Sequence, residues 1–215
     1  MPAPAKSAIV TIAQQKGGAG KTTVAVQLAT ALRQAGRSVA VVDIDPQASL
    51  TGWMRMREHE ARDAAEIRFS MVGGWRLGVE LDRLKSEVDW IVVDSPPHAE
   101  SDAKGAIKAA DLVLVPCQPS PLDIWASKGT LDIAINDGKP ASLVLNRVPA
   151  RGRSVDEALQ SIAERGYAAL SARLGNRQAF ITSLGRGLGV VESEPRSAAA
   201  HEVQALAAEV EQLLR

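Results

Sequence analysis

A glycine-rich run between a β-type segment and a helical segment carries the strongest chemical signal in the sequence. Residues 16–23 read Lys-Gly-Gly-Ala-Gly-Lys-Thr-Thr. Glycines let the backbone turn tightly so that its N–H groups point at phosphate oxygens, and the N-terminus of the following helix adds partial positive charge. In such a loop Lys21 reaches the β- and γ-phosphates of a nucleotide, and the Thr22 hydroxyl ligates Mg²⁺. The run predicts a phosphate-binding loop, with an ordinary glycine turn before a helix as the alternative.

The loop departs from the standard phosphate-loop pattern at its first position. That pattern has a glycine separated by four residues from its Gly-Lys pair. This chain has Gln15 there, and a second lysine, Lys16, follows it. We expect the loop itself to supply the phosphate contacts, through Lys16, Gly17, Gly18, Ala19, Gly20, Lys21, Thr22 and Thr23.

Acidic residues stand where two apolar runs end. Asp94 closes the run 90–93, and Asp43 closes the run 39–42, with Asp45 two residues later. A carboxylate at a strand end beside a phosphate loop can hold Mg²⁺ through water, because this ion keeps most of its hydration shell. We assign that role to Asp94. A purely structural role is also compatible with this sequence: an Asp that caps a strand, or an Asp-Pro turn at residues 45–46.

Short Val/Ile/Leu runs alternate with helical patterns along most of the chain. Strands that are covered by helices on both faces are apolar on both faces. The alternation therefore predicts an α/β fold with a parallel, twisted sheet flanked by helices. The expected strands are 7–14, 39–43, 67–72, 90–94, 112–115 and 142–146, and the expected helices include 54–66, 154–172 and 197–214. Gly36 has the position of a glycine that ends the first helix.

Composition narrows the class of protein. We expect the 215 residues to form one domain, with residues 1–6 as a loose tail. Lys and Arg together number 25, as do Asp and Glu, so the formal net charge is zero. The protein as a whole therefore has no positive electrostatic field that would attract polyanions. The single cysteine, Cys117, excludes an internal disulfide or a four-cysteine zinc site. Apolar runs fall far short of the ~20 residues that span a bilayer, and no signal core is present. We therefore expect a cytoplasmic protein.

Taken together, the loop and the acidic motifs resemble the ParA/MinD superfamily of P-loop ATPases, whose deviant Walker A loop has the extra lysine. Residues 42–47 are similar to its second acidic motif, residues 94–97 to its Walker B strand end, and residues 115–121 to a loop typical of ParA proteins. The matches span residues 7–147, although Cys117 stands where a small apolar residue is expected. The resemblance implies weak ATP hydrolysis with Mg²⁺, an ATP-dependent homodimer and a ParB-like adaptor that stimulates hydrolysis.

The resemblance also implies roles for single residues. Lys16 would reach across a nucleotide-sandwiched dimer to the partner's phosphates, as an arginine finger does. Asp45 would position or activate the attacking water, so Lys16, Lys21 and Asp45 form the expected catalytic set. Asp43 would support the outer shell of the metal, and Asn146 would meet the adenine. A solvated loop lysine and a turn-forming asparagine are the plainer interpretations of Lys16 and Asn146.

The segment after the last expected strand has a different charge. Residues 147–196 contain eight arginines and five acids, a net of +3 in a chain of zero net charge. Clustered arginine is typical of contact with a phosphate backbone, although solvated helix faces would look the same. We expect residues 147–215 to be the helical, DNA-facing part, with Arg173, Arg177 and Arg186 contacting non-specific DNA. Together with the resemblance, these arginines lead us to expect a ParA-like partitioning ATPase associated with the nucleoid.

Two other functions are compatible with the same fold: a switch at the membrane surface and a metabolic enzyme. A MinD-like switch at the membrane surface needs a basic C-terminal helix, but residues 198–215 have Glu202, Glu209 and Glu211 against Arg215, which anionic lipid would repel. A metabolic enzyme of the iron-protein branch needs two cysteines per subunit, and this chain has one. Amidotransfer-type relatives are not excluded, but would not be expected to have the proline-rich loop at 116–121.

Overall fold

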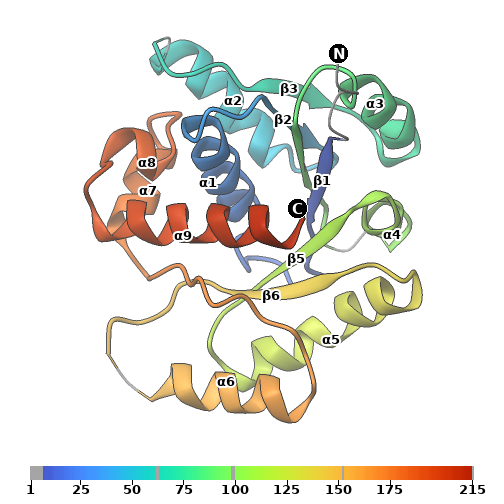
Figure 1. Cartoon of the computed structure of the whole chain (residues 1–215), viewed down its shortest axis with the longest axis vertical. Helices are drawn as coiled ribbons and strands as arrows, with labels where there is room; N and C mark the ends of the chain where they lie inside the picture. The colour runs from blue at the N-terminus through green and yellow to red at the C-terminus, as the bar shows by residue number, and fades with distance from the viewer. Residues whose placement is uncertain (1–6, 62, 98–99, 152, 215) are drawn as a thin grey trace.

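The computed structural model describes residues 7–61, 63–97, 100–151 and 153–214, so the expected tail at residues 1–6 lies outside the described part (Figure 1). Strands and helices alternate along the described chain. In order they are β1 Ala8–Ile12, α1 Lys21–Gln34, β2 Val39–Asp43, α2 Ser49–Glu60, β3 Arg68–Met71, η1 Gly74–Arg76, α3 Leu77–Leu84, β4 Trp90–Asp94, α4 Glu100–Ala109, β5 Leu112–Cys117, α5 Pro121–Asn136, β6 Ala141–Leu145, α6 Ser154–Glu164, α7 Gln178–Leu184, α8 Val190–Ser193 and α9 Ala198–Leu213.

Within the described ranges, six strands form one parallel sheet in the order β3-β2-β4-β1-β5-β6, which confirms the predicted fold class. All strands run the same way, so their carboxyl ends meet at one edge. Asp43 of β2 lies directly opposite Asp94 of β4 in the register. The phosphate loop follows β1, the strand beside β4. The topology therefore brings the loop and both acidic motifs to one edge of the sheet.

Alternating strand residues bury the two faces of the sheet separately. On β1, Val10 and Ile12 belong to a core shared with α1, α2 and α7 to α9, whereas Ile9 packs in a second core with α3. Helices α4, α5 and α6 continue that second face over β5 and β6 (Figure 1). Both faces are covered by helices, which explains why the strand sequences are apolar on both sides.

Two expected helices have different limits in the structure. The expected helix 54–66 is α2, which begins at Ser49 and ends at Glu60. The expected helix 154–172 ends at Glu164, because Gly166 takes a φ of 67° and the chain then turns. The backbone N–H of Leu143 donates to the Ala168 carbonyl and that of Leu170 to the Leu143 carbonyl, both at 2.9 Å. Backbone pairing beside β6 thus replaces the last helical turns.

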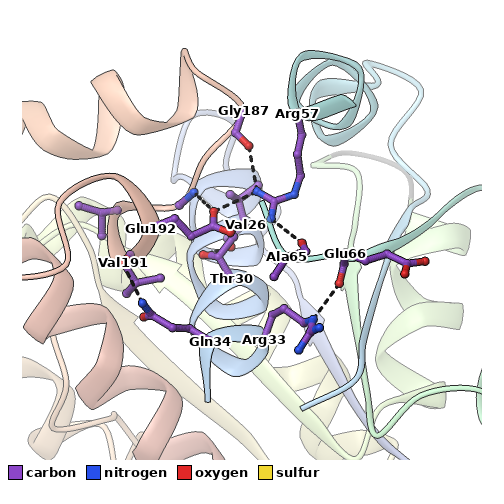
Figure 2. Close-up of polar contacts among 12 residues, drawn as sticks. Val26, Thr30, Arg33, Gln34, Arg57, Ala65, Glu66, Gly187, Val191 and Glu192 are labelled. Atoms are coloured by element: carbon purple, nitrogen blue, oxygen red, sulfur yellow. Dashed lines mark hydrogen bonds and ion pairs between the residues drawn. The ribbon is translucent and has the colours of Figure 1, made fainter. Parts of the chain in front are cut away.

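A buried ion pair, here called the Arg57–Glu192 clamp, ties α2 to the segment around α8 (Figure 2). The Arg57 guanidinium donates to both Glu192 carboxylate oxygens, at 2.9 and 2.7 Å, and to the carbonyls of Gly187 and Ala65. Glu192 also accepts the backbone N–H of Gly189 at 2.8 Å. The clamp joins residues 135 positions apart in the sequence and holds the segment around α8 against α2. No helix in the described ranges is long and apolar enough to cross a membrane.

Candidate active site

The loop between β1 and α1 has the backbone shape that a phosphate cradle needs. Gly18 and Gly20 have φ values of 74° and 96°, a region that side chains rarely adopt. A Cβ at Gly20 would collide with the Asn146 amide nitrogen, which donates to the Ala19 carbonyl at 3.0 Å. A Cβ at Gly17 or Gly18 would meet no atom of the described residues within 4 Å. The loop is thus closed toward Asn146, and its glycines line a cavity on another side.

Thr22 and Asp94 meet at the start of α1 with the chemistry of a magnesium site. The Thr22 hydroxyl donates to Asp94 Oδ2 at 2.6 Å, and the buried Asp94 Oδ1 has no hydrogen-bond partner in the described part of the chain. Burial, with Asp43 and Asp45 nearby, raises the pKa of Asp94 to about 7, although Thr22 and Lys21 oppose the shift. A buried carboxylate oxygen without a partner beside a hydroxyl fits a hard divalent cation or its water.

Lys21, the first residue of α1, is 7% exposed at the same place. Burial lowers the pKa of its ammonium group, while Asp94 and Asp45 raise it. A buried cation with this little solvent is costly unless an anion compensates it. The position of Lys21 therefore fits the binding of a phosphate group.

The two acidic residues of the second motif have different surroundings. Asp43 is completely buried, and its Oδ2 accepts the backbone N–H and the hydroxyl of Thr51 at 2.8 and 2.7 Å. Its Oδ1 accepts the backbone N–H of Asp45 at 3.0 Å. These bonds hold the turn into α2, and they place Asp45 on the wall of the cavity that Lys21 and Thr22 line. The outer-shell role of Asp43 stays a prediction, and its observed contacts position Asp45.

Two adjoining cavities extend from the loop. The smaller, of about 270 Å³, is lined by the phosphate loop, Asp45 and the start of α2. The larger, of about 410 Å³, is lined by Asn146, Gln118 and the segment from Gly175 to Leu184. Thr23 and Arg147 line both cavities. A nucleotide with phosphates in the smaller cavity and its base beside Asn146 fits this arrangement.

Lys16 lies outside the smaller cavity, unlike Lys21. Its side chain is 41% exposed, and Nζ is 2.8 Å from Asp123 Oδ1 in the first turn of α5. Asp123 also receives a hydrogen bond from Ser120, the N-cap of that helix. The second lysine of the loop is therefore held by an acid of α5 rather than at the phosphate side. Sequence reasoning missed Asp123, although the Ser-Pro-Leu-Asp start of a helix at 120–123 is a local signal for it.

The three arginines that we expected at DNA have different surroundings. Arg177 lines the larger cavity and is paired with Glu202 at 2.6 Å, which raises the pKa of its guanidinium. Arg173 has a buried Nε without a hydrogen-bond partner among the described residues. Arg186, past the other end of α7, lines a cavity of about 690 Å³ against α2. Their role at DNA stays a prediction.

Comparison with known proteins agrees with this geometry. The family model described as the CobQ/CobB/MinD/ParA nucleotide binding domain matches residues 10–190. "Maintenance of carboxysome distribution protein A" of Halothiobacillus neapolitanus is 31% identical over 95% of this chain and 97% of its own length. The protein of the same name from Gloeobacter kilaueensis is 34% identical, with 88% and 87% covered. The septum site-determining protein MinD of Pyrococcus horikoshii, solved with Mg-ADP, has a TM-score of 0.80 at 22% identity, with 97% of each chain covered.

The chain belongs to the CobQ/CobB/MinD/ParA nucleotide-binding family. The predicted superfamily is confirmed, and with it the class of protein, a ParA/MinD-type ATPase. The predicted ATP and Mg²⁺ agree with the Mg-ADP of the solved MinD structure.

Proposed function

We propose that this chain is a ParA-like positioning ATPase. In this proposal it dimerises on ATP, binds DNA without sequence preference on the nucleoid, and is reset when a ParB-like or other adaptor stimulates hydrolysis. The observation that carries it is Lys16, a phosphate-loop lysine that lies outside its own phosphate cavity and is paired with Asp123, from which a second subunit could recruit it. Two similar relatives are named for carboxysome distribution, which supports a large protein assembly as the cargo.

In this proposal each site residue has a separate task. Lys21 and the loop N–H groups hold the phosphates, and Asn146 closes the loop and borders the base. Thr22 and Asp94 hold Mg²⁺, the latter through water, and the ion would neutralise charge that develops on the phosphates. Asp45, fixed by Asp43, orients the attacking water. Lys16 contributes its charge to the partner's phosphates.

For Lys16 to reach the partner's phosphates, its ion pair with Asp123 must break. The lysine side chain is 41% exposed, whereas the Asp123 side chain is 9% exposed. The Asp123 carboxylate keeps the hydrogen bond from the Ser120 hydroxyl when Lys16 leaves, so the release leaves no carboxylate without a partner. A desolvated phosphate contact in a closed dimer would compensate the cost of the lost ion pair. The resting monomer keeps Lys16 close to the loop without using it.

Lys16→Ala should bind ATP as the wild type does and lose at least ~100-fold in adaptor-stimulated turnover, because a cation supplied in trans is worth about 10³–10⁵ in rate. Phosphate release at saturating ATP measures this. Asp123→Asn is the matched control, since it removes the ion pair but keeps Lys16, and its turnover should stay close to wild type. Wild-type turnover in Lys16→Ala, or an equal loss in Asp123→Asn, would contradict a role in trans.

DNA binding should require ATP, because a dimer doubles the number of arginines that one particle presents. With about four to six phosphate contacts, affinity should fall on the order of 10²–10³ between 50 and 200 mM salt. Replacing Arg173, Arg177 and Arg186 with alanine should weaken binding equally on two unrelated duplexes and flatten the salt dependence. Arg55→Ala, an exposed arginine of α2, is the control. Fluorescence anisotropy with ATP, ADP and no nucleotide provides the measurement.

The other outcomes of that titration identify the alternatives. Sedimentation with anionic liposomes instead of DNA binding would favour the membrane switch, and binding to neither would favour a metabolic ATPase. The packing of α9 weighs against the membrane switch: Val203, Leu206 and Val210 are buried in the core with α1, so this face is not available to lipid. Glu209 of the same helix accepts the backbone N–H groups of Ser171 and Ala172.

A further inference from the structure

We propose that Arg147 binds the α-phosphate of the nucleotide, at the junction between the phosphate cavity and the base cavity. The proposal rests on the proposed function only in placing a nucleotide in these two cavities. In the sequence Arg147 is one of the eight arginines of residues 147–196.

The backbone of Arg147 is the first observation. Its φ is 53°, in the left-handed region that a long side chain rarely adopts outside a constrained site. Hydrogen bonds on both sides impose this conformation. Asn146 Oδ1 accepts the Arg147 N–H at 2.9 Å, and the Asn146 N–H donates to the Cys117 carbonyl. Val148 exchanges backbone hydrogen bonds with Leu174 and Asn176. The chain is thus held in a strained turn that fixes where the arginine emerges.

The place where it emerges is the second observation. Arg147 and Thr23 are shared by the linings of the two cavities, and Thr23 belongs to the phosphate loop. Lys21, Thr22 and Asp45 lie on the smaller cavity, whereas Asn146 and Phe180 lie on the larger. A nucleotide with its terminal phosphates in the first and its base in the second must cross this junction with its α-phosphate and ribose.

The charge of Arg147 is the third observation. The side chain is exposed, and its guanidinium makes no ion pair or hydrogen bond to any residue in the described ranges. Arg177, on the wall of the larger cavity, is by contrast paired with Glu202. A guanidinium is always charged and presents a planar fork that matches phosphate oxygens. Arg147 is therefore a cation at the junction that is available to an anionic ligand.

The α-phosphate is common to ATP and ADP, so the contact should strengthen both alike. Arg147→Asn and Arg147→Gly remove the guanidinium and keep a residue that accepts a positive φ. Both variants should bind ATP and ADP about 10- to 100-fold more weakly in isothermal titration calorimetry, as expected for one charged hydrogen-bonding contact. The melting temperature of the nucleotide-free protein should be unchanged or raised, because the strained turn is relieved. Arg55→Asn should alter neither quantity.

Three results would overturn the proposal: unchanged affinity for both nucleotides, a loss confined to ATP, or a melting temperature lowered in both variants. The titrations are made in the Lys16→Ala background, which we expect to stay monomeric, so they do not depend on dimerisation or DNA. Lys21→Ala in the same series separates the two failures. If that variant also binds normally, the nucleotide site itself is wrong; if it alone loses binding, only the role of Arg147 is wrong.

Discussion

Replacing Lys21 with alanine should reduce ATP affinity by at least ~100-fold. Lys21 is a buried cation in the first turn of α1 and on the wall of the smaller cavity, and Asp94 and Asp45 both act on its charge. The variant would leave the phosphates to the loop N–H groups alone, in a cavity with two carboxylates close by. Charge-assisted contacts to phosphate lose more on truncation than neutral ones, because the remaining charges are uncompensated. Calorimetric titration with ATP and Mg²⁺ measures the loss.

Two further variants control this experiment. Asp45→Ala removes a carboxylate from the same cavity and should keep ATP binding while slowing hydrolysis, as expected for a residue that orients water. Lys104→Ala, an exposed lysine of α4, should alter neither binding nor hydrolysis. ATP affinity in Lys21→Ala equal to that of the wild type would contradict the assignment of the phosphate loop.

Replacing Glu192 with alanine should destabilise the fold by about 3–5 kcal/mol, because it leaves the buried Arg57 guanidinium with carbonyl partners only. The Arg57 side chain is 6% exposed, so water cannot replace the lost carboxylate. For a chain of this length the loss corresponds to a melting temperature lower by roughly 6–20 °C. Thermal unfolding followed by circular dichroism measures it.

The exposed pair Lys128–Asp132 on α5 supplies the control for the clamp. Asp132→Ala breaks an ion pair between a cation and a carboxylate that lies at the surface. It should lower the free energy of unfolding by less than about 1 kcal/mol. A double variant, Arg57→Met with Glu192→Met, should recover part of the stability lost in Glu192→Ala, because no unpaired charge remains buried. Equal melting temperatures for Glu192→Ala and Asp132→Ala would show that the clamp does not stabilise the fold.

The central part of the fold was predictable because its signals are local. The apolar runs that end at Asp43 and Asp94 are strands of the sheet, and the glycine run before Lys21 is a left-handed turn at a helix start. Each depends on a few consecutive residues. The end of α6 was not predictable in this way, because residues 167–170 pair with β6 rather than continue a helix. Backbone pairing with β6, which is distant in the sequence, determines the conformation of residues 167–170.

The same distinction between local and long-range signals applies to the site residues and to the Arg57–Glu192 clamp. Lys21, Thr22 and Asp94 follow from the motif and the topology of a parallel sheet, which brings strand ends together. Arg57 and Glu192 are 135 residues apart, and no pattern connects them. The functional interest of Arg147 comes from a positive φ and from two adjoining cavities, which only a structure reveals.

Light scattering of the Asp45→Ala protein would show whether Lys16 closes an ATP-dependent dimer. Because this variant should bind ATP and hydrolyse it slowly, we expect twice the monomer mass in ATP and Mg²⁺ and the monomer mass in ADP. Adding Lys16→Ala to the same variant should restore the monomer mass in ATP, with ATP affinity retained. A monomer in every nucleotide state, or an equal dimer with and without Lys16, would contradict a dimer that Lys16 closes.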